Sequence, residues 1–242
     1  MELYVDLFSQ PCRSVFMVAK ALGIPFELKN VELLEGQQYS EDFAKLSLVK
    51  KVPVMKDGNF VLTESVAILQ YMVEKYCSTV ADHWYPSDLQ QRARVMNICH
   101  GSIRTLRAHG SRMYQMRVFY PILMDVEVPE EKMSVAVEDL NESLYLLEEK
   151  FLQNKAFIVG DSISLADVVA LAEIMQPVGS GLDVFEGRPK LTAWKERVKK
   201  AVGEKVFDEA HQKILNMGGM AQKMKNSPGL EMFKPKFKKL FI

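Results

Sequence analysis

Hydrophobic residues recur with two different spacings near the start of the chain. Leu3, Val5 and Leu7 fall on one face at a period of two, which is typical of a β-strand. After the segment Ser9-Gln-Pro-Cys-Arg13 the apolar residues recur at helical spacing, and Pro11 suits the first turn of a helix. The sequence therefore predicts a strand that leads directly into a helix.

More strands and a second helix are predicted before residue 80. Strand-like patterns cover residues 25–33, 52–56 and 59–62, and a helix starts near Thr63. Asp57-Gly58 is a favoured hairpin turn between the last two strands. A strand, helix, strand order predicts a parallel pair with a right-handed crossover, whereas the hairpin must be antiparallel. We therefore expect a small mixed sheet.

From about residue 88 onward the strand patterns vanish and the chain reads as helical. Amphipathic stretches cover residues 89–120, 129–152, 165–175, 189–202 and 204–217. Ser164 and Asp167 have the spacing of a capping box at the start of one of them. Residues 76–87 break both periodicities and contain a proline, so we place a domain boundary near residue 80. The expected domains are residues 1–80, an α/β unit, and residues 88–242, an all-helical unit.

Composition narrows the class of protein. With 242 residues, 48% hydrophobic and 26% charged, the chain has enough apolar content for one or two cores, which excludes a disordered, collagen-like or coiled-coil protein. The 31 basic and 31 acidic side chains cancel, so there is no overall attraction to nucleic acid or an anionic membrane. Three cysteines give no disulfide framework, and no signal peptide or membrane-spanning run is recognised. We expect a cytoplasmic protein with reduced thiols.

The junction of the first strand and first helix is a candidate site. Unpaired backbone amides and the positive end of a helix dipole favour an anion there. Ser9 stands where C-x-x-C redox motifs carry their reactive cysteine, and Cys12 falls inside the helix. Dithiol exchange is therefore disfavoured, and the junction could instead bind a foreign thiol. The alternative is that Ser9 is simply a helix N-cap.

Several segments together resemble the cytosolic glutathione transferases, and in detail the theta class. They are Ser9-Gln-Pro-Cys-Arg13, Lys51-Val-Pro53, Leu62-Thr-Glu-Ser65 and residues 160–167, within the same order of elements over nearly the whole chain. The resemblance implies a thioredoxin-like N-terminal domain that binds glutathione and a helical domain that binds an electrophile. It also implies that Ser9 is the catalytic residue, donating a hydrogen bond that stabilises the glutathione thiolate. Glutathione is then a co-substrate, no metal or other cofactor is needed, and the protein is a homodimer.

The same resemblance assigns the glutathione-binding residues. Lys51 would bind the glycine carboxylate, the backbone of Val52 would pair with the cysteinyl part, and Pro53 would follow a cis peptide bond. Gln38 stands where theta proteins usually have a histidine near the glycyl end. Glu64 and Ser65 would bind the γ-glutamyl ammonium and carboxylate groups, although Glu64 could also simply compensate a helix dipole.

Further candidates lie in the first long helix of the second half. By resemblance Arg107 would lie near the active site and Arg104 would face glutathione in the other subunit, although both could belong to a solvated basic face. Met113, Met116 and Phe119 could line the electrophile pocket, or could be ordinary core residues. Residues 231–242 resemble an extension that covers the site, and no specific contact of this tail is predicted.

The expected reaction is attack of glutathione thiolate on small electrophiles such as alkyl or aralkyl halides, with reduction of organic hydroperoxides as a second activity. A non-catalytic glutathione- or ligand-binding protein of the same fold is the main alternative. A thiol-disulfide oxidoreductase would instead depend on Cys12 and tolerate Ser9→Ala. An esterase is disfavoured because no G-x-S-x-G segment is present.

Overall fold

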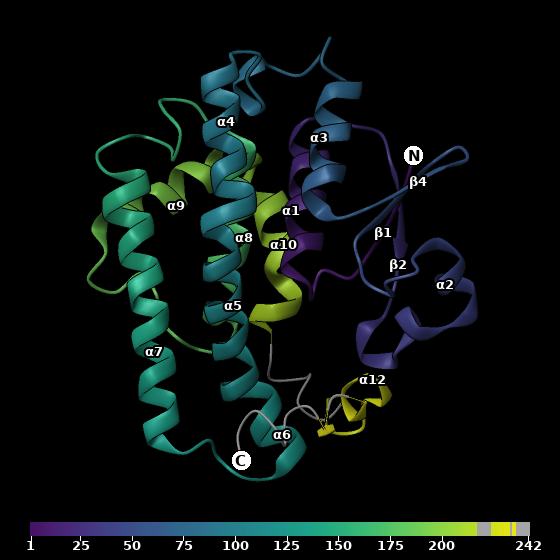
Figure 1. Ribbon diagram of the computed structural model, residues 1–242, viewed down its shortest axis with the longest axis vertical. Coiled ribbons are helices and arrows are strands. Elements are labelled where there is room, and N and C mark those ends of the chain that lie inside the picture. The colour runs from purple at the N-terminus through teal and green to yellow at the C-terminus, as the bar shows by residue number, and fades with distance from the viewer. Residues whose placement is uncertain (217–223, 233, 236–242) are drawn as a thin grey trace.

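The N-terminal part of the computed structural model is a four-stranded mixed sheet. The structure describes residues 1–216, 224–232, 234 and 235. The strands are β1 (Glu2–Val5), β2 (Glu27–Asn30), β3 (Val54–Asp57) and β4 (Phe60–Thr63), in the order β2-β1-β3-β4 (Figure 1). β1 is parallel to β2, and β3 is antiparallel to both of its neighbours. The predicted mixed sheet is confirmed.

The first two strands are shorter than predicted because Asp6 turns the chain. Its carboxylate accepts hydrogen bonds from the amides of Phe8, at 2.9 Å, and Leu33, at 3.0 Å. These bonds end strand pairing soon after Val5 and Asn30, and β2 is limited to Glu27–Asn30 within the predicted range 25–33. A local side-chain bond of this kind competes with the ladder of a sheet.

Helices and short 3₁₀ turns connect the strands. α1 (Gln10–Ala21) follows β1 with Pro11 in its first turn, and α3 (Ser65–Lys75) follows β4. Between β2 and β3 lie η1 (Leu33–Glu35), η2 (Gln37–Tyr39) and α2 (Glu41–Leu46), where the sequence predicts only an irregular linking stretch. Ser40 is the N-cap of α2, and its hydroxyl accepts a hydrogen bond from the amide of Phe43 at 3.2 Å.

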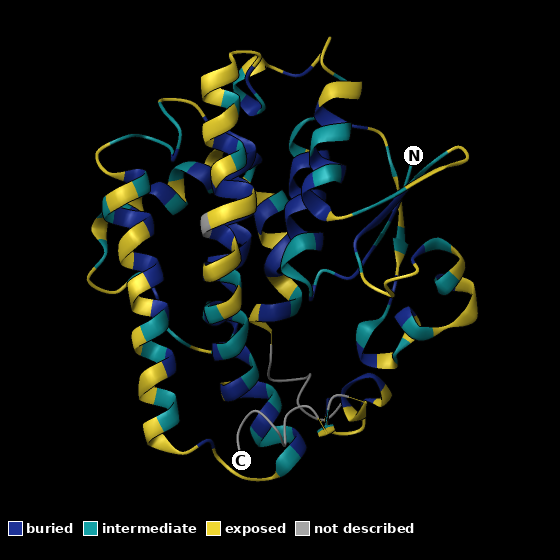
Figure 2. Ribbon diagram, viewed as in Figure 1, coloured by how far each residue is buried: buried dark blue, intermediate teal, exposed yellow. Residues whose placement is uncertain are grey.

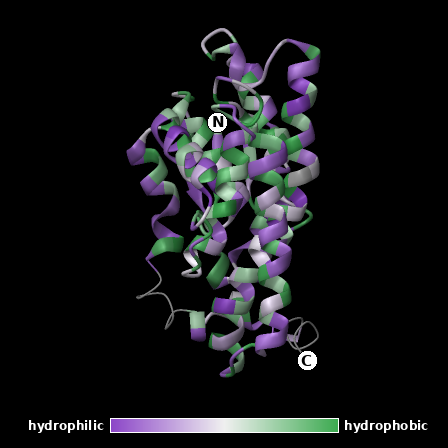
Figure 3. Ribbon diagram, turned by 90° about the vertical axis from the view of Figure 1, so that its left-hand side faces the viewer, coloured by the Kyte–Doolittle hydropathy of each residue, from purple (hydrophilic) through white to green (hydrophobic). Residues whose placement is uncertain are grey.

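The rest of the described chain is helical, as predicted. A 3₁₀ turn, η3 (Asp82–Trp84), comes first. One long helix follows, made of α4 (Leu89–Asn97), α5 (Ile103–Tyr114) and α6 (Tyr120–Met124). The π-helical turns η4 (Ile98–Ser102) and η5 (Gln115–Phe119) join these three parts. Then come α7 (Glu130–Tyr145) with the π-helical η6 (Leu146–Leu152), α8 (Leu165–Gly179), α9 (Pro189–Val202), α10 (Glu204–Leu215) and α12 (Pro228–Glu231). Hydrophilic and hydrophobic positions alternate along the outer helices in Figure 3, as an amphipathic pattern requires. Met217, the predicted end of α10, lies outside the described residues.

Helix α8 is the centre of the molecule. All its residues from Leu165 to Pro177 are buried, and it packs against α1 and α5 (Figure 2). Its start has the predicted capping box: the Asp167 carboxylate accepts from the amide of Ser164 at 2.9 Å, from that of Ile158 at 2.8 Å and from Trp194 Nε1 at 2.9 Å. Helix α8 therefore joins α1 of the sheet domain to the helical domain. Across the described ranges, no helix combines the length and apolar character needed to cross a membrane.

A buried histidine makes the stability of this core depend on pH. His211 in α10 is completely buried, and burial, with the nearby Arg13 cation, lowers its pKa to about 3 from 6.5. The unfolded chain therefore binds a proton at His211 near pH 6.5, whereas the folded chain does not. The stability contributed by the neutral, buried His211 is thus present above pH 6.5 and is lost as the pH falls below it. We expect His211 to account for about 2 kcal/mol of the loss of unfolding free energy between pH 7 and pH 5.

The measurement is urea unfolding at both pH values for His211→Asn and for the matched variant His100→Asn, whose histidine is exposed. His211→Asn should remove this part of the pH dependence, and His100→Asn should leave it intact. Equal pH dependence in all three proteins would contradict the prediction.

Candidate active site

A cavity of about 510 Å³ lies between the sheet domain and the helical domain. The β1–α1 loop, the two 3₁₀ turns and the loop before β3 form one side of it. The long helix forms the other side, and α12, which packs on η1, adds Gly229 and Leu230 to the wall. Its wall includes the predicted residues Ser9, Gln38, Lys51, Val52, Arg107 and Phe119, and also Phe8, Gln10, Pro11, Leu33, Leu34, Tyr39, Val49, Lys50, Gly229 and Leu230.

Ser9 occupies the N-cap position of α1 but does not cap the helix through its side chain. Its backbone is extended, with φ −86° and ψ 128°, and its carbonyl accepts the first helical bond from the amide of Arg13 at 3.1 Å. Within the described chain, no amide of α1 donates to the Ser9 hydroxyl. This hydroxyl is therefore not used to cap α1; it interacts with the Cys12 thiol and lines the cavity beside the positive end of the helix dipole.

Cys12 is a poor candidate for a reactive thiol. Burial raises the pKa of the Cys12 thiol to about 12, although hydrogen bonds with the backbone of Asp6 and the side chain of Ser9 lower it in part. The side chain has no exposed surface and belongs to the hydrophobic core. Because the thiolate is the nucleophilic form, this cysteine is inert at neutral pH. The geometry thus disfavours the thiol-disulfide oxidoreductase alternative.

The segment before β3 presents backbone and charge to the cavity. The Val52–Pro53 peptide bond is cis, which confirms the prediction for Pro53. Val52 is half-buried on the wall and Lys51 is exposed at its edge. The hydroxyl of Ser47 donates to the carbonyl of Lys51 at 3.3 Å, which fixes the approach of this segment to the strand.

Gln38 contributes a buried amide to the wall. Its side chain is 4% exposed, and its Oε1 atom has no hydrogen-bond partner among the described residues. A buried acceptor without a partner costs about 1 to 3 kcal/mol. A ligand with an N–H or O–H group would remove this cost, so Gln38 is equipped to bind a donor in the cavity.

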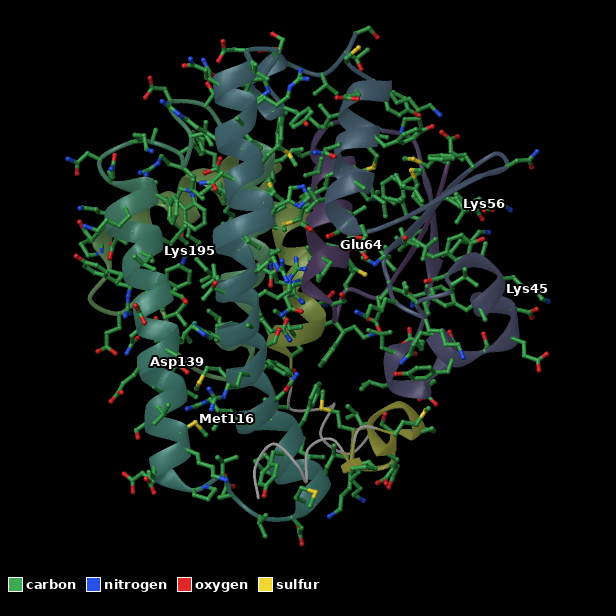
Figure 4. All side chains as sticks on the ribbon, in the orientation of Figure 1. Lys45, Lys56, Glu64, Met116, Asp139 and Lys195 are labelled. Carbon is green, nitrogen blue, oxygen red and sulfur yellow. The ribbon has the colours of Figure 1, made fainter. Side chains whose placement is uncertain are left out.

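Glu64 and Ser65 lie at the start of α3 and not on the wall of this cavity. Ser65 is buried, whereas Glu64 is exposed, at the lower end of α3 in Figure 4. Glu64 has φ +67° and ψ 112°. This left-handed conformation is unfavourable for a residue with a side chain and is often found at functional sites.

The residues predicted on the long helix have different surroundings. Phe119 lines the cavity and stacks on Phe8, with ring centroids 5.8 Å apart. Met113 and Met116 have no exposed surface and lie in the core instead of on this wall; Figure 4 marks Met116 near the lower end of the long helix. Arg104 is exposed and also away from the wall. An amphipathic pattern cannot separate these cases, since core and cavity residues share one apolar face.

Arg107 lies on the cavity wall and forms an ion pair with Glu173. Its side chain is 36% exposed, and its Nη2 atom lies 2.7 Å from Oε1 of Glu173. Burial raises the pKa of the Glu173 carboxyl, while Arg107 and Arg13 favour its charged form.

In the ranges that the structure describes, no three His, Cys, Asp or Glu side chains gather to hold a metal ion.

Helix α12 is a part of the wall that sequence reasoning missed. The Ser227 hydroxyl donates to the carbonyl of Leu34, and Leu230 faces the cavity. A Cβ atom on Gly229 would overlap the carbonyl oxygen of Leu33, so only glycine allows this approach. Of the predicted cover, residues 231–242, positions 233 and 236–242 lie outside the described residues.

Comparison with known proteins agrees with this fold and site. Residues 3–79 match the family model of the glutathione S-transferase N-terminal domain, and residues 112–200 match that of the C-terminal domain. The chain is 52% identical to human glutathione S-transferase theta-1 over 215 residues, which cover 89% of each chain. The chain therefore belongs to the glutathione S-transferase family.

Its relatives place it within the theta class. Mouse glutathione S-transferase theta-3 is 48% identical over 220 residues, with 91% of this chain and 90% of that protein covered. The structure of human glutathione-S-transferase T1-1 in its apo form superposes with a TM-score of 0.88 at 47% identity and covers 100% of this chain and 99% of that one. Human glutathione transferase theta-2, solved with glutathione, has the same TM-score at 42% identity, with coverage of 96% and 95%.

Proposed function

We propose that this protein catalyses attack of the glutathione thiolate on small electrophiles, in particular alkyl and aralkyl halides. The observation that carries the proposal is the Ser9 hydroxyl, which no amide of α1 uses and which lines a cavity at the positive end of that helix. A hydroxyl there donates a hydrogen bond to sulfur and favours its ionised form. Ser9 keeps its proton and is not itself the nucleophile.

The sheet side of the cavity would bind the tripeptide. The backbone of Val52 would pair with the cysteinyl part, Lys51 would bind the glycine carboxylate, and Gln38 would accept a hydrogen bond near the glycyl end. Glu64 and Ser65 would bind the γ-glutamyl zwitterion at the start of α3, beyond the cavity wall. The buried Oε1 atom of Gln38, which has no hydrogen-bond partner in the described part of the chain, supports the assignment of that residue.

The helical side would hold the electrophile. Phe119 and Leu230 give an apolar surface next to Phe8 of the sheet side, and Arg107 gives a cation for negative charge on the reacting atoms. Confining both substrates in one cavity removes much of the entropic barrier to their meeting. In this division residues 1–80 bind glutathione and residues 88–242 bind the electrophile, which the ranges of the two family models support.

The names of solved relatives support the same chemistry. One human theta-class structure contains the glutathione conjugate of 1-menaphthyl sulfate and is 42% identical to this chain. We further infer a cytoplasmic homodimer in which Arg104 faces the site of the other subunit. The free state of Cys12, Cys77 and Cys99 fits a reducing compartment.

The test is a glutathione-dependent assay across haloalkanes, aryl halides and organic hydroperoxides. We expect turnover of haloalkanes above the spontaneous rate, and activity on hydroperoxides would add the peroxidase reaction. Tight glutathione binding without turnover of any of the three classes would overturn the proposal in favour of the non-catalytic binding protein.

A further inference from the structure

The guanidinium of Arg107 is fixed by a carboxylate from the centre of the molecule. Its Nε and Nη2 atoms both lie close to Oε1 of Glu173, at 2.8 and 2.7 Å. The side chain of Glu173 is 1% exposed and comes from α8, whereas Arg107 comes from α5. Nη1 of Arg107 takes part in no hydrogen bond within the described residues. One edge of the guanidinium is thus held by the protein, and Nη1 remains for a ligand.

A second guanidinium connects the same helix to the Ser9 loop. Arg13 is completely buried in α1. Its Nη1 atom donates to the carbonyl oxygens of Leu7 and Phe8, both at 3.0 Å, and its Nη2 atom donates to the carbonyl of Ala172 at 3.0 Å and to Gln176 Oε1 at 2.7 Å. Leu7 and Phe8 directly precede Ser9. Helix α8 therefore anchors both the hydroxyl and the cation of the cavity.

Burying the charged side chains of Glu173 and Arg13 in this way does not favour the stability of the fold. Oε2 of Glu173 and Nε of Arg13 are both buried without a hydrogen-bond partner among the described residues. Removing charges from water costs several kcal/mol per ion unless every group is paired. Burial lowers the pKa of Arg13 to about 10, so this group is still charged at neutral pH. A charged cluster with unpaired atoms at its centre points to a role in the adjacent cavity.

We propose that Glu173 is a positioning residue: it holds the Arg107 guanidinium on the cavity wall so that Nη1 can bind the negative charge of the reacting atoms. The inference rests on the proposed function. In that reaction an electron pair of the thiolate forms the carbon–sulfur bond, and the carbon–halogen bond breaks as halide leaves with its pair. The negative charge thus moves from sulfur to halide, and a cation fixed beside this path stabilises it without reorganisation.

The test is a double-mutant cycle with Glu173→Gln, Arg107→Ala and the combined variant. Gln keeps the shape but replaces the ion pair with weaker hydrogen bonds from the guanidinium to a neutral amide oxygen, so we expect kcat to fall about fivefold to tenfold with a smaller change in KM for glutathione. In the Arg107→Ala background the same substitution should change kcat by less than about twofold, because Glu173 acts through Arg107. Asp139→Asn is the matched control. Asp139 of α7 (Figure 4) forms a surface ion pair with Arg112, which lies on α5 as Arg107 does. It should leave kcat unchanged.

An equal loss of kcat in both backgrounds would show that Glu173 acts only through the fold, and no loss in either would show that it has no role. Either result overturns the inference while the proposed function stands, whereas an inactive wild type overturns the proposed function itself. If Glu173→Gln does not fold, Glu173→Asp keeps the charge, withdraws it by one methylene, and should show the same non-additivity.

Titration of the bound glutathione thiol shows whether Arg107 stabilises the negative charge on the sulfur or on the leaving halide. A raised thiol pKa in Glu173→Gln places Arg107 beside the sulfur, and an unchanged pKa with a larger kcat loss for poorer leaving groups places it beside the halide.

Discussion

Replacing Ser9 with alanine is expected to lower kcat/KM for glutathione conjugation by about 10- to 100-fold at neutral pH. A thiol with an ordinary pKa of about 8.5 needs a shift of one to two units to be largely ionised, which corresponds to about 1.4 to 2.7 kcal/mol. One hydrogen bond to a charged acceptor supplies roughly 1.5 to 3 kcal/mol, and a helix N-terminus adds about 0.3 to 1 kcal/mol. Most of the shift therefore depends on the Ser9 hydroxyl. Steady-state kinetics with a haloalkane measures the effect.

The pH profile and a neighbouring substitution control this result. The deficit of Ser9→Ala should shrink as the pH rises above about 8.5, because the thiol then ionises without help. Cys12→Ala, on the same helix, should retain most of the activity. Loss of activity in Cys12→Ala with little change in Ser9→Ala would favour the oxidoreductase alternative.

Replacing Asp167 with alanine is expected to have the largest effect on stability, about 3 to 5 kcal/mol of unfolding free energy. The substitution leaves four buried donors without their acceptor: the amides of Ser164 and Ile158, the Ser164 hydroxyl and Trp194 Nε1. It also removes the capping box of α8, the helix on which both sides of the cavity depend. Urea unfolding at neutral pH measures the change.

Asp161→Ala is the matched control for this position. Asp161 lies in the same loop before α8 and is exposed, so its substitution should change the unfolding free energy by no more than about 0.5 kcal/mol. Similar and small effects of the two substitutions would contradict the role assigned to Asp167.

The elements that the sequence predicts well are those with local signals. The Asp57-Gly58 hairpin, the Ser164 and Asp167 capping box and α9 at Pro189–Val202 follow from turn chemistry, caps and periodicity over a few residues. The ends of β1 and β2 differ because Asp6 bonds to an amide 27 residues away as well as to its own loop. A spacing pattern does not contain such a long-range contact.

The residues of the site also separate into those with a local sequence signal and those that depend on long-range contacts. Ser9 and the Lys51-Val-Pro53 segment carry local motifs, and the structure brings them onto one cavity wall or beside it. The docking of α12 could not be predicted, because the contact of Gly229 with Leu33 joins segments far apart in sequence. Glu173 had a usable signal, since it is the single charged residue in the otherwise apolar stretch 168–175 of α8. A charge in such a run has to find a buried partner.

Spectroscopic titration of the glutathione thiol in the bound complex tests the central claim most directly. Ultraviolet absorption of the thiolate, followed across pH in wild type and in Ser9→Ala, reports the pKa of the bound sulfur. We expect a pKa about one to two units below the ordinary value of about 8.5 in wild type, and a return close to that value in Ser9→Ala. A bound thiol with an ordinary pKa in wild type, or the same lowered pKa in both proteins, would contradict the role of the Ser9 hydroxyl.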